Sequence, residues 1–297
     1  MEGKNLMKNT AIRTIAAAAL ALALAGCGAS SSATTSSSSS EDKTIRVGAT
    51  SVPHAEILND AVKPILEKEG WTLEVTEFTD YVTPNTALED GSLDANYFQT
   101  LGYMNNQNED NGLHLAAAVG VHIEPMGIYS ATLTSIDDLK DGAKISLPND
   151  VDNCDRALRL LVQKGLLEDP KTDDHLTETT FNGNSELNPH GYVITPVEAA
   201  NVPNTLNDVD IAVVNGNYAL EAKLNESHPA IEIEEFDKDT TIARTNFIVV
   251  EQGNEDTEKT KALVKACTSD EVKKYIEDTY KGAVIASFIN EDGSAAE

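Results

Sequence analysis

Residues 144–165 run KISLPNDVDNCDRALRLLVQKG, and this stretch decides the fold class. Residues 144–147 form a short apolar segment of the kind that becomes a buried strand. From residue 152 to 165 the apolar side chains recur at helical spacing, so that one face carries Ala157, Leu158, Leu161 and Val162. A buried strand, a loop and an amphipathic helix in succession form the repeating unit of α/β proteins.

The same alternation extends along the chain in both directions. Strands are expected at 44–49, 73–78, 93–97, 211–214 and 242–250. Helices are expected at 58–66, 258–267 and 270–280, with short ones starting at Thr83-Pro84 and at the capping sequence Ser135-x-x-Asp. Pro64 argues against a straight first helix. The pattern predicts an α/β fold with mostly parallel sheets and no internal repeat.

Ligands of such sheets bind beyond the carboxyl ends of the strands, so the residues that follow each strand are candidates for a site. Arg156 follows the strand at 144–147 and is expected in the first turn of the next helix, where a cation opposes the helix dipole. A bound carboxylate, held by the guanidinium and by free helix N–H groups, would offset this. An ion pair with Asp150, Asp152 or Asp155 would explain Arg156 equally well.

Asn215 directly follows the strand at 211–214 and can offer its side-chain carbonyl to an ammonium group; the alternative is a simple turn residue. Aromatic side chains follow the second and third strands, namely Tyr81, Tyr97, Phe98 and Tyr103. They suit an apolar pocket for a thioether, although at least one is expected to be an ordinary core residue. A carboxylate clamp, an amine acceptor and an apolar pocket are what an α-amino acid with an apolar side chain requires.

The N-terminus predicts export. A basic segment with Lys4, Lys8 and Arg13 precedes an apolar run at 15–25 and then Leu-Ala-Gly-Cys at 24–27. This pattern resembles a bacterial lipobox, which implies cleavage before Cys27 and lipidation of that residue. We therefore expect a signal peptide at 1–26 and a Ser-rich tether at 27–42, rather than a buried helix with an ordinary cysteine. No other segment is long and apolar enough to span a membrane.

Charge and cysteine content exclude some functions. A net charge of −27 opposes nucleic-acid binding, which depends on cationic contacts to phosphate. Cys154 and Cys267 are expected to be small free thiols, although an exported protein permits a disulfide.

Four segments carry a resemblance to a known family. They are FTDYVTPNTALEDGSLDANYFQTLGYM (78–104), SIDDLKDGAKISLPNDVDNCDRALRLL (135–161), VDIAVVNGNYAL (209–220) and DTYKGAVIASF (278–288). The chain resembles the methionine-binding lipoproteins of the NlpA type, which are components of methionine ABC importers. The resemblance implies a two-lobe periplasmic-binding-protein-like fold (type II) with a ligand cleft. One lobe would comprise 43–125 plus 246–297 and the other 126–245, with crossings near 123–127 and 243–247.

The resemblance also implies roles for single residues. Arg156 would hold the ligand carboxylate, and Asn215, with Asn201 nearby, would hold the amine. The side-chain pocket would be lined by Tyr81, Phe98 and Tyr103. Two positions depart from the family: Thr100 stands where His is common, and Asp155 where a small residue is common. They leave open whether the ligand is L-methionine, D-methionine, a methionine derivative or a short methionine peptide.

The expected protein is lipid-anchored on the extracytoplasmic face of the cell membrane, where it passes its ligand to an importer permease and ATPase. No cofactor, metal or catalysis is expected. A metal-binding lipoprotein of another importer is the nearest alternative, but it needs converging histidines, and the six here are expected to be scattered on the surface. A secreted hydrolase lacks any recognised catalytic motif, and an adhesive surface protein is permitted by the tether.

Overall fold

The computed structural model describes residues 42–296, and Asp42–Glu297 form one compact unit. The predicted signal peptide, Cys27 and residues 27–41 of the predicted tether lie outside the described residues. Within 42–296, no helix has both the length and the apolar character needed to cross a bilayer.

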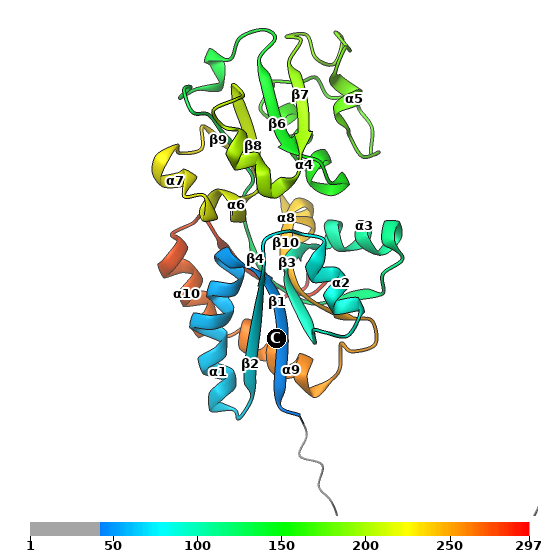
Figure 1. Ribbon diagram of the computed structural model, residues 1–297, viewed down its shortest axis with the longest axis vertical. Coiled ribbons are helices and arrows are strands. Elements are labelled where there is room, and N and C mark those ends of the chain that lie inside the picture. The colour runs from blue at the N-terminus through cyan, green and yellow to red at the C-terminus, as the bar shows by residue number, and fades with distance from the viewer. Residues whose placement is uncertain (1–41, 297) are drawn as a thin grey trace, which may run out of the picture. The chain divides into compact units, whose positions relative to one another are not determined.

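Six strands form the first sheet, in the order β11-β4-β10-β3-β1-β2. Their bounds are β1 (Thr44–Thr50), β2 (Thr72–Phe78), β3 (Ala95–Thr100), β4 (Leu115–Ile123), β10 (Thr245–Glu251) and β11 (Ile285–Ile289). Figure 1 shows this sheet in the lower half of the molecule, with α1 and α10 to one side and α2 and α3 to the other. Because helices cover the sheet on both sides, its central strands are buried.

Five strands form the second sheet, in the order β7-β6-β8-β5-β9. Their bounds are β5 (Gly127–Tyr129), β6 (Lys144–Pro148), β7 (Val193–Val197), β8 (Ile211–Val214) and β9 (Glu232–Ile233). It occupies the upper half of Figure 1 together with α4, α5 and α7.

The α/β class is confirmed, but the expectation of mostly parallel sheets is wrong. In the first sheet β1 pairs in parallel with β2 and β3, whereas β10 runs antiparallel to β3 and β4, and β11 antiparallel to β4. In the second, β6 pairs in parallel with β7 and β8, whereas β5 is antiparallel to β8 and β9. The pair β4–β10 is antiparallel because the chain leaves the first sheet along β4 and returns to it along β10 in the opposite direction.

The chain passes between the sheets at two places. Residues 124–126 join β4 to β5, and residues 234–244, which include α8 (Lys238–Arg244), join β9 to β10. The first segment coincides with the crossing that the resemblance implies near 123–127, whereas the second begins well before the one implied near 243–247. The lobe boundaries stay a prediction. In Figure 1, α6 and α8 lie at the level between the two sheets.

The helices at 151–163, 258–267 and 270–280 follow the apolar periodicity, whereas the helix at 101–111 has almost no apolar face and was not predicted. The bounds of the longer helices are α1 (Lys63–Lys68), α2 (Thr83–Glu89), α3 (Leu101–Asn111), α4 (Val151–Gln163), α9 (Glu258–Cys267) and α10 (Asp270–Tyr280); short helices are η1 (Ser51–Ala55), η2 (Ile57–Val62), η3 (Ile136–Asp138), α5 (Glu178–Phe181), η4 (Ala199–Thr205), α6 (Gly216–Glu221) and α7 (Leu224–Ser227). The first predicted helix is divided into η2 and α1, and Pro64 lies in the first turn of α1, where its missing N–H costs nothing.

The predicted strand at 242–250 starts three residues too early. Residues 242–244 end helix α8, which begins with a capping box formed by Asp237 and Thr240, and only residues 245–251 form a strand. The β-branched run led the prediction to start the strand too early.

The two sheets have separate apolar cores. On one face of the first sheet, β-strand side chains pack on η2, α1, α9 and α10, and this core includes Cys267. The second sheet packs on α4, and this core includes Cys154. Both cysteines are buried free thiols, as predicted.

Candidate functional site

A pocket lies where strand ends of the two sheets meet. Its lining residues are Tyr81, Phe98, Gln99, Thr100, Tyr103, Glu124, Asn153, Arg156, Asn215, Gly216, Asn217 and Asn246. They follow or end β2, β3, β4 and β8, or begin β10, α4 and α6. The cavity that these residues enclose is about 30 Å³, room for about one water molecule, so the lining side chains lie close together around it.

Three aromatic rings form one wall. The ring centroids of Tyr81 and Phe98 are 5.8 Å apart, those of Tyr81 and Tyr103 5.7 Å, and those of Phe98 and Tyr103 6.0 Å. Tyr218 stacks on Tyr81 at 4.9 Å. Tyr97 points to the opposite face of β3 from Phe98, because side chains alternate along a strand, and it is the core aromatic residue that we expected.

Arg156 lies in the second turn of α4, one turn later than predicted, and is buried. Its Nε donates to both carboxylate oxygens of Glu234 at 3.0 Å, and its Nη2 donates to Glu234 Oε2 at 2.6 Å and to the backbone oxygen of Glu124 at 2.9 Å. Burial lowers the pKa of Arg156, but the Glu234 carboxylate outweighs this and raises it overall. The partner is thus Glu234 rather than a neighbouring aspartate. Of the three guanidinium nitrogens of Arg156, Nη1 alone has no hydrogen-bond partner among the described residues.

Two asparagines at the start of α6 present buried polar atoms to the pocket. Asn215 Nδ2 donates to Asn153 Oδ1 at 2.7 Å, whereas Asn215 Oδ1 has no hydrogen-bond partner among the described residues. Asn217 Oδ1 accepts from the Tyr81 hydroxyl at 2.6 Å, whereas Asn217 Nδ2 has no such partner. A buried acceptor and a buried donor without partners are costly unless a ligand satisfies them.

Of the remaining residues that the sequence singled out, one lines the pocket and two do not. Thr100 lines the pocket, and its hydroxyl lies 3.4 Å from Asp152 Oδ2. Asn201 is exposed, bonds to Glu198 and is absent from the pocket lining. The Asp155 carboxylate binds Arg159 at 2.9–3.0 Å and the Leu176 amide at 2.8 Å. Both oxygens of Asp155 are therefore engaged away from the pocket, and it does not act on the ligand directly.

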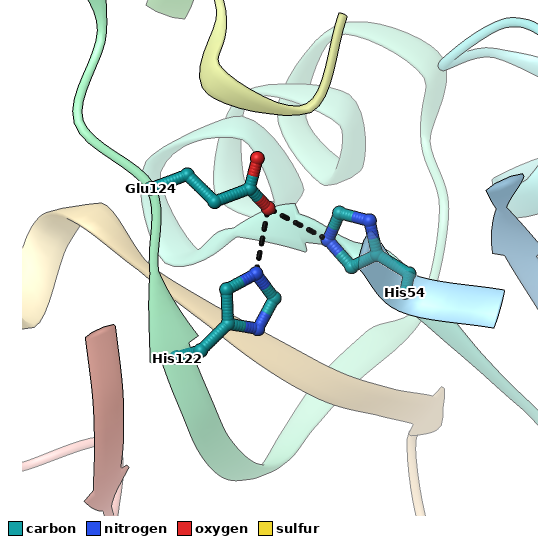
Figure 2. A group of neighbouring side chains, drawn as sticks. All are labelled: His54, His122 and Glu124. Atoms are coloured by element: carbon teal, nitrogen blue, oxygen red, sulfur yellow. Dashed lines mark hydrogen bonds and ion pairs between the residues drawn. The ribbon is translucent and has the colours of Figure 1, made fainter. Parts of the chain in front are cut away.

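A buried cluster of His54, His122 and Glu124 adjoins the pocket through Glu124. Figure 2 shows both imidazoles directed at one carboxylate oxygen: His122 Nε2 lies 2.6 Å and His54 Nε2 3.3 Å from Glu124 Oε1. The other ring nitrogens bond to the hydroxyls of Thr50, at 2.8 Å, and Tyr97. The expectation that all histidines lie scattered on the surface is wrong for these two.

Burial sets the charge of this cluster. It lowers the pKa of His54 to about 4 and of His122 to about 3, so both rings are neutral. It raises the pKa of Glu124 to about 7, against the opposing effects of His54, Arg156 and the Asn217 amide. Two imidazoles and a carboxylate also form a donor set for a divalent metal. Here each ring is already hydrogen-bonded at both nitrogens, and the Arg156 guanidinium binds the Glu124 backbone, which opposes a further cation.

Glu124, Asn217 and Glu234 were missed by sequence reasoning. Glu124 follows β4, which was not predicted as a strand, so its position at a strand end went unnoticed. Glu234 is separated from Arg156 by 78 residues, and no local pattern joins them. Asn217 stands two residues after Asn215. Because ligands bind beyond the carboxyl ends of strands, its position after β8 could have identified it as a candidate.

Known proteins resemble this chain over most of its length. The methionine-binding lipoprotein MetQ of Bacillus subtilis (strain 168) is 40% identical over 248 residues, which cover 82% of this chain and 88% of that protein. A nutrient binding protein from Burkholderia cenocepacia, solved bound to methionine, is 38% identical with a TM-score of 0.75, covering 82% of this chain and all of that one. The substrate binding protein of a methionine transporter from Streptococcus pneumoniae is 32% identical with a TM-score of 0.75, covering 82% and 95%.

The match extends over nearly all of the described residues. The family model of the NlpA lipoproteins matches residues 45–288, from the first strand of the first sheet to its last, and so includes every residue that lines the pocket. The chain belongs to the NlpA lipoprotein family.

Proposed function

We propose that this protein is an extracytoplasmic, lipid-anchored solute-binding protein that captures methionine, or a close analogue, and delivers it to an ABC importer. The observation that carries the proposal is the pair of buried, unpartnered atoms on one pocket wall, the acceptor Asn215 Oδ1 and the donor Asn217 Nδ2. An α-amino acid presents the complementary pair, an ammonium group and a carboxylate. The names of the relatives and the methionine in the Burkholderia cenocepacia protein support the same ligand.

In this proposal the carboxylate binds Asn217 Nδ2 and Arg156 Nη1, and the ammonium binds Asn215 Oδ1. Arg156 contributes one edge only, because Glu234 already occupies the Nε–Nη2 edge. The thioether lies against Tyr81, Phe98 and Tyr103, where sulfur–aromatic contacts are favourable. The protein makes or breaks no covalent bond.

Delivery requires a change of state that the importer recognises. The ligand contacts residues on elements of both sheets, so it favours a closed arrangement to the extent that it binds that arrangement more tightly. Lipidation at Cys27 and the tether would hold the protein near the permease and its ATPase.

Isothermal titration of unlipidated residues 42–297, unfolded and refolded to remove any host-derived ligand, tests the proposal. L-methionine is titrated first, then D-methionine, methionine sulfoxide and glycyl-methionine. One-to-one binding of L-methionine with a micromolar or lower Kd is the expected result. Binding of an analogue alone would keep the importer role and change the ligand, and no heat with any of the four compounds would refute the proposal.

A further inference from the structure

Glu124 is the acidic residue among those that line the pocket, and the ligand contacts proposed above do not involve it. Its side chain is 5% exposed, and it immediately follows β4 where the chain leaves the first sheet. A buried carboxylate is costly unless its oxygens are hydrogen-bonded or paired with a cation.

The two oxygens of Glu124 have different surroundings. Oε1 lies within 3.3 Å of both His54 Nε2 and His122 Nε2. Oε2 receives no side-chain hydrogen bond from the residues described, and in Figure 2 it points away from both rings. The His122 imidazole therefore fixes the carboxylate by one oxygen and leaves the other directed elsewhere.

Oε2 lies against the turn that carries Asn215. A Cβ added to Gly216 would lie 3.2 Å from Glu124 Oε2 and only 2.7 Å from Glu124 Cβ. The absence of a side chain at Gly216 thus lets the turn between β8 and α6 approach Glu124 closely. Asn215, the preceding residue, has its Oδ1 buried without a partner.

Among the described residues the Glu124 carboxylate accepts one backbone hydrogen bond, from the Asn217 amide, and Asn215 Oδ1 accepts none, so this wall still presents two acceptors to a ligand. A primary ammonium group carries three N–H donors and a positive charge, so it satisfies both acceptors and pairs with the carboxylate, whereas a hydroxyl has only one donor and a neutral amide has no charge.

We infer that Glu124 binds the ammonium group of the ligand through Oε2, and that His122, whose Nε2 lies 2.6 Å from Oε1, is the positioning residue that holds the carboxylate. The Nε2 of His54 lies 3.3 Å from Oε1 but bonds to Asn246 Oδ1 at 3.2 Å. This inference rests on the proposed function, because it names the residue that selects a free ammonium group in the same pocket.

The test compares two ligands that differ only in this group: methionine and its α-hydroxy analogue, which has a hydroxyl in place of the ammonium. Both are titrated calorimetrically at pH 8 into the wild-type protein and into Glu124→Gln, which keeps the size of the side chain. The wild type should prefer methionine by about 100-fold, the scale of a desolvated charge pair. Glu124→Gln should weaken methionine binding by about 30-fold or more and change analogue binding by less than about threefold.

The positioning role has its own readout. His122→Gln keeps an N–H donor near the position of Nε2 and should retain most of the preference for methionine, whereas His122→Leu should lose it. Because the ratio of two affinities is measured on one protein sample, a general loss of folded protein does not imitate the effect. If His122→Leu does not fold, Glu124→Gln and His122→Gln still decide the matter.

Two results would overturn the inference. The first is that the wild type binds methionine and Glu124→Gln shows the same preference for methionine over the α-hydroxy analogue. The proposed function would then hold, and the role of Glu124 would be refuted. The second is stoichiometric Zn²⁺ binding to the wild type that Glu124→Gln abolishes, with the ligand preference unchanged, because the cluster would then serve a metal. A wild type that binds neither compound would refute the proposed function and this inference together.

Discussion

Arg156 pairs with the carboxylate of Glu234, and in the proposed site it also binds the carboxylate of the ligand. Arg156→Ala should weaken methionine binding at least about 30-fold, because a charged contact in a desolvated site is lost. It should also lower the free energy of unfolding by roughly 3 kcal/mol, since Glu234 is left buried without its main partner. Calorimetry and urea denaturation measure the two effects.

Arg159→Ala is the matched control. Arg159 lies on the same helix and pairs with Asp155, but its side chain is 40% exposed and outside the pocket. We expect a change in stability below about 1 kcal/mol and an unchanged Kd. Equal effects of the two variants on affinity would show that the helix, and not the Arg156 side chain, determines binding.

The inferred role of Glu124 predicts that methionine binding depends on pH. Its pKa is raised to about 7 by burial, and an ammonium ligand binds the ionised form. The histidines that face it, with pKa values lowered to about 4 and 3, stay neutral above pH 5, and the guanidinium of Arg156 stays charged. Affinity should therefore rise with pH, about tenfold between pH 6 and pH 8, from the linkage of proton release to binding. A profile for Glu124→Gln that rises as steeply as the wild type would assign the dependence to another group.

At the residue scale, the sequence identified pocket-lining residues where they follow a strand that it also predicted. It did not identify pocket-lining residues that follow an unpredicted strand. Tyr81, Phe98, Thr100, Tyr103 and Asn215 all line the pocket, and their roles in ligand binding stay predictions. Glu234, the partner of Arg156, and Glu124, the partner of His122, could not be predicted in this way, because burial and pairing between distant segments are decided only when both sheets are assembled.

At the scale of elements, the turn between β8 and α6 brings Asn215 to Glu124, and Gly216 makes the approach possible. Gly216→Val should force the turn away from Glu124 and Pro125, since even a Cβ would lie 2.7 Å and 3.0 Å from their atoms. We expect methionine affinity to fall at least about tenfold and stability by roughly 1–3 kcal/mol, as in overpacked sites.

Gly91→Ala serves as the control for this change. Gly91 has a φ of 76°, and a Cβ there meets no atom within 4 Å, so only backbone strain is added. Stability should fall by about 1 kcal/mol while the Kd for methionine stays the same. An unchanged Kd in Gly216→Val would contradict the importance of the turn.

Elements with strong local signals were predicted almost to the residue, and elements defined by distant partners were not. Helices α9 and α10 and strand β8 match the predicted bounds, because caps and apolar runs mark them locally. Strand β4 is absent from the prediction because its alanine- and glycine-rich start has no strand signal, and it is stabilised by β10 and β11, more than 100 residues later. The direction of β10 depends on the same distant pairing.

At the scale of the whole molecule, side-chain bonds join elements of the two sheets. Asp152 at the start of α4 lies 3.4 Å from both Thr100 Oγ1 and Arg244 Nη1, and the Tyr218 hydroxyl donates to the Thr79 backbone at 3.3 Å. Asp152→Ala should shift the ligand-free protein toward open arrangements, because each such bond contributes about 1 kcal/mol.

Small-angle scattering measures this shift. The radius of gyration of ligand-free Asp152→Ala should exceed that of the wild type, and saturating methionine should remove the difference. Asp169→Ala, which removes an exposed pair with Lys171 within one region, is the control and should scatter like the wild type. Identical scattering of all three ligand-free proteins would show that these bonds do not hold the two sheets together.

Each of the two apolar cores contains one buried cysteine, and the rate at which that cysteine is labelled reports how often its core opens. Cys154 belongs to the core of the second sheet and lies on α4 two residues before Arg156, whereas Cys267 belongs to the core of the first. Burial raises the pKa of the Cys154 thiol to about 12, so an aromatic disulfide reagent reacts only when its core opens. In residues 42–297, which lack Cys27, methionine should slow labelling of Cys154 more than that of Cys267. Equal slowing of the two reactions would mean instead that both cores open only in global unfolding, and the protein's own sulfur atoms would then report its overall stability in place of its local motions.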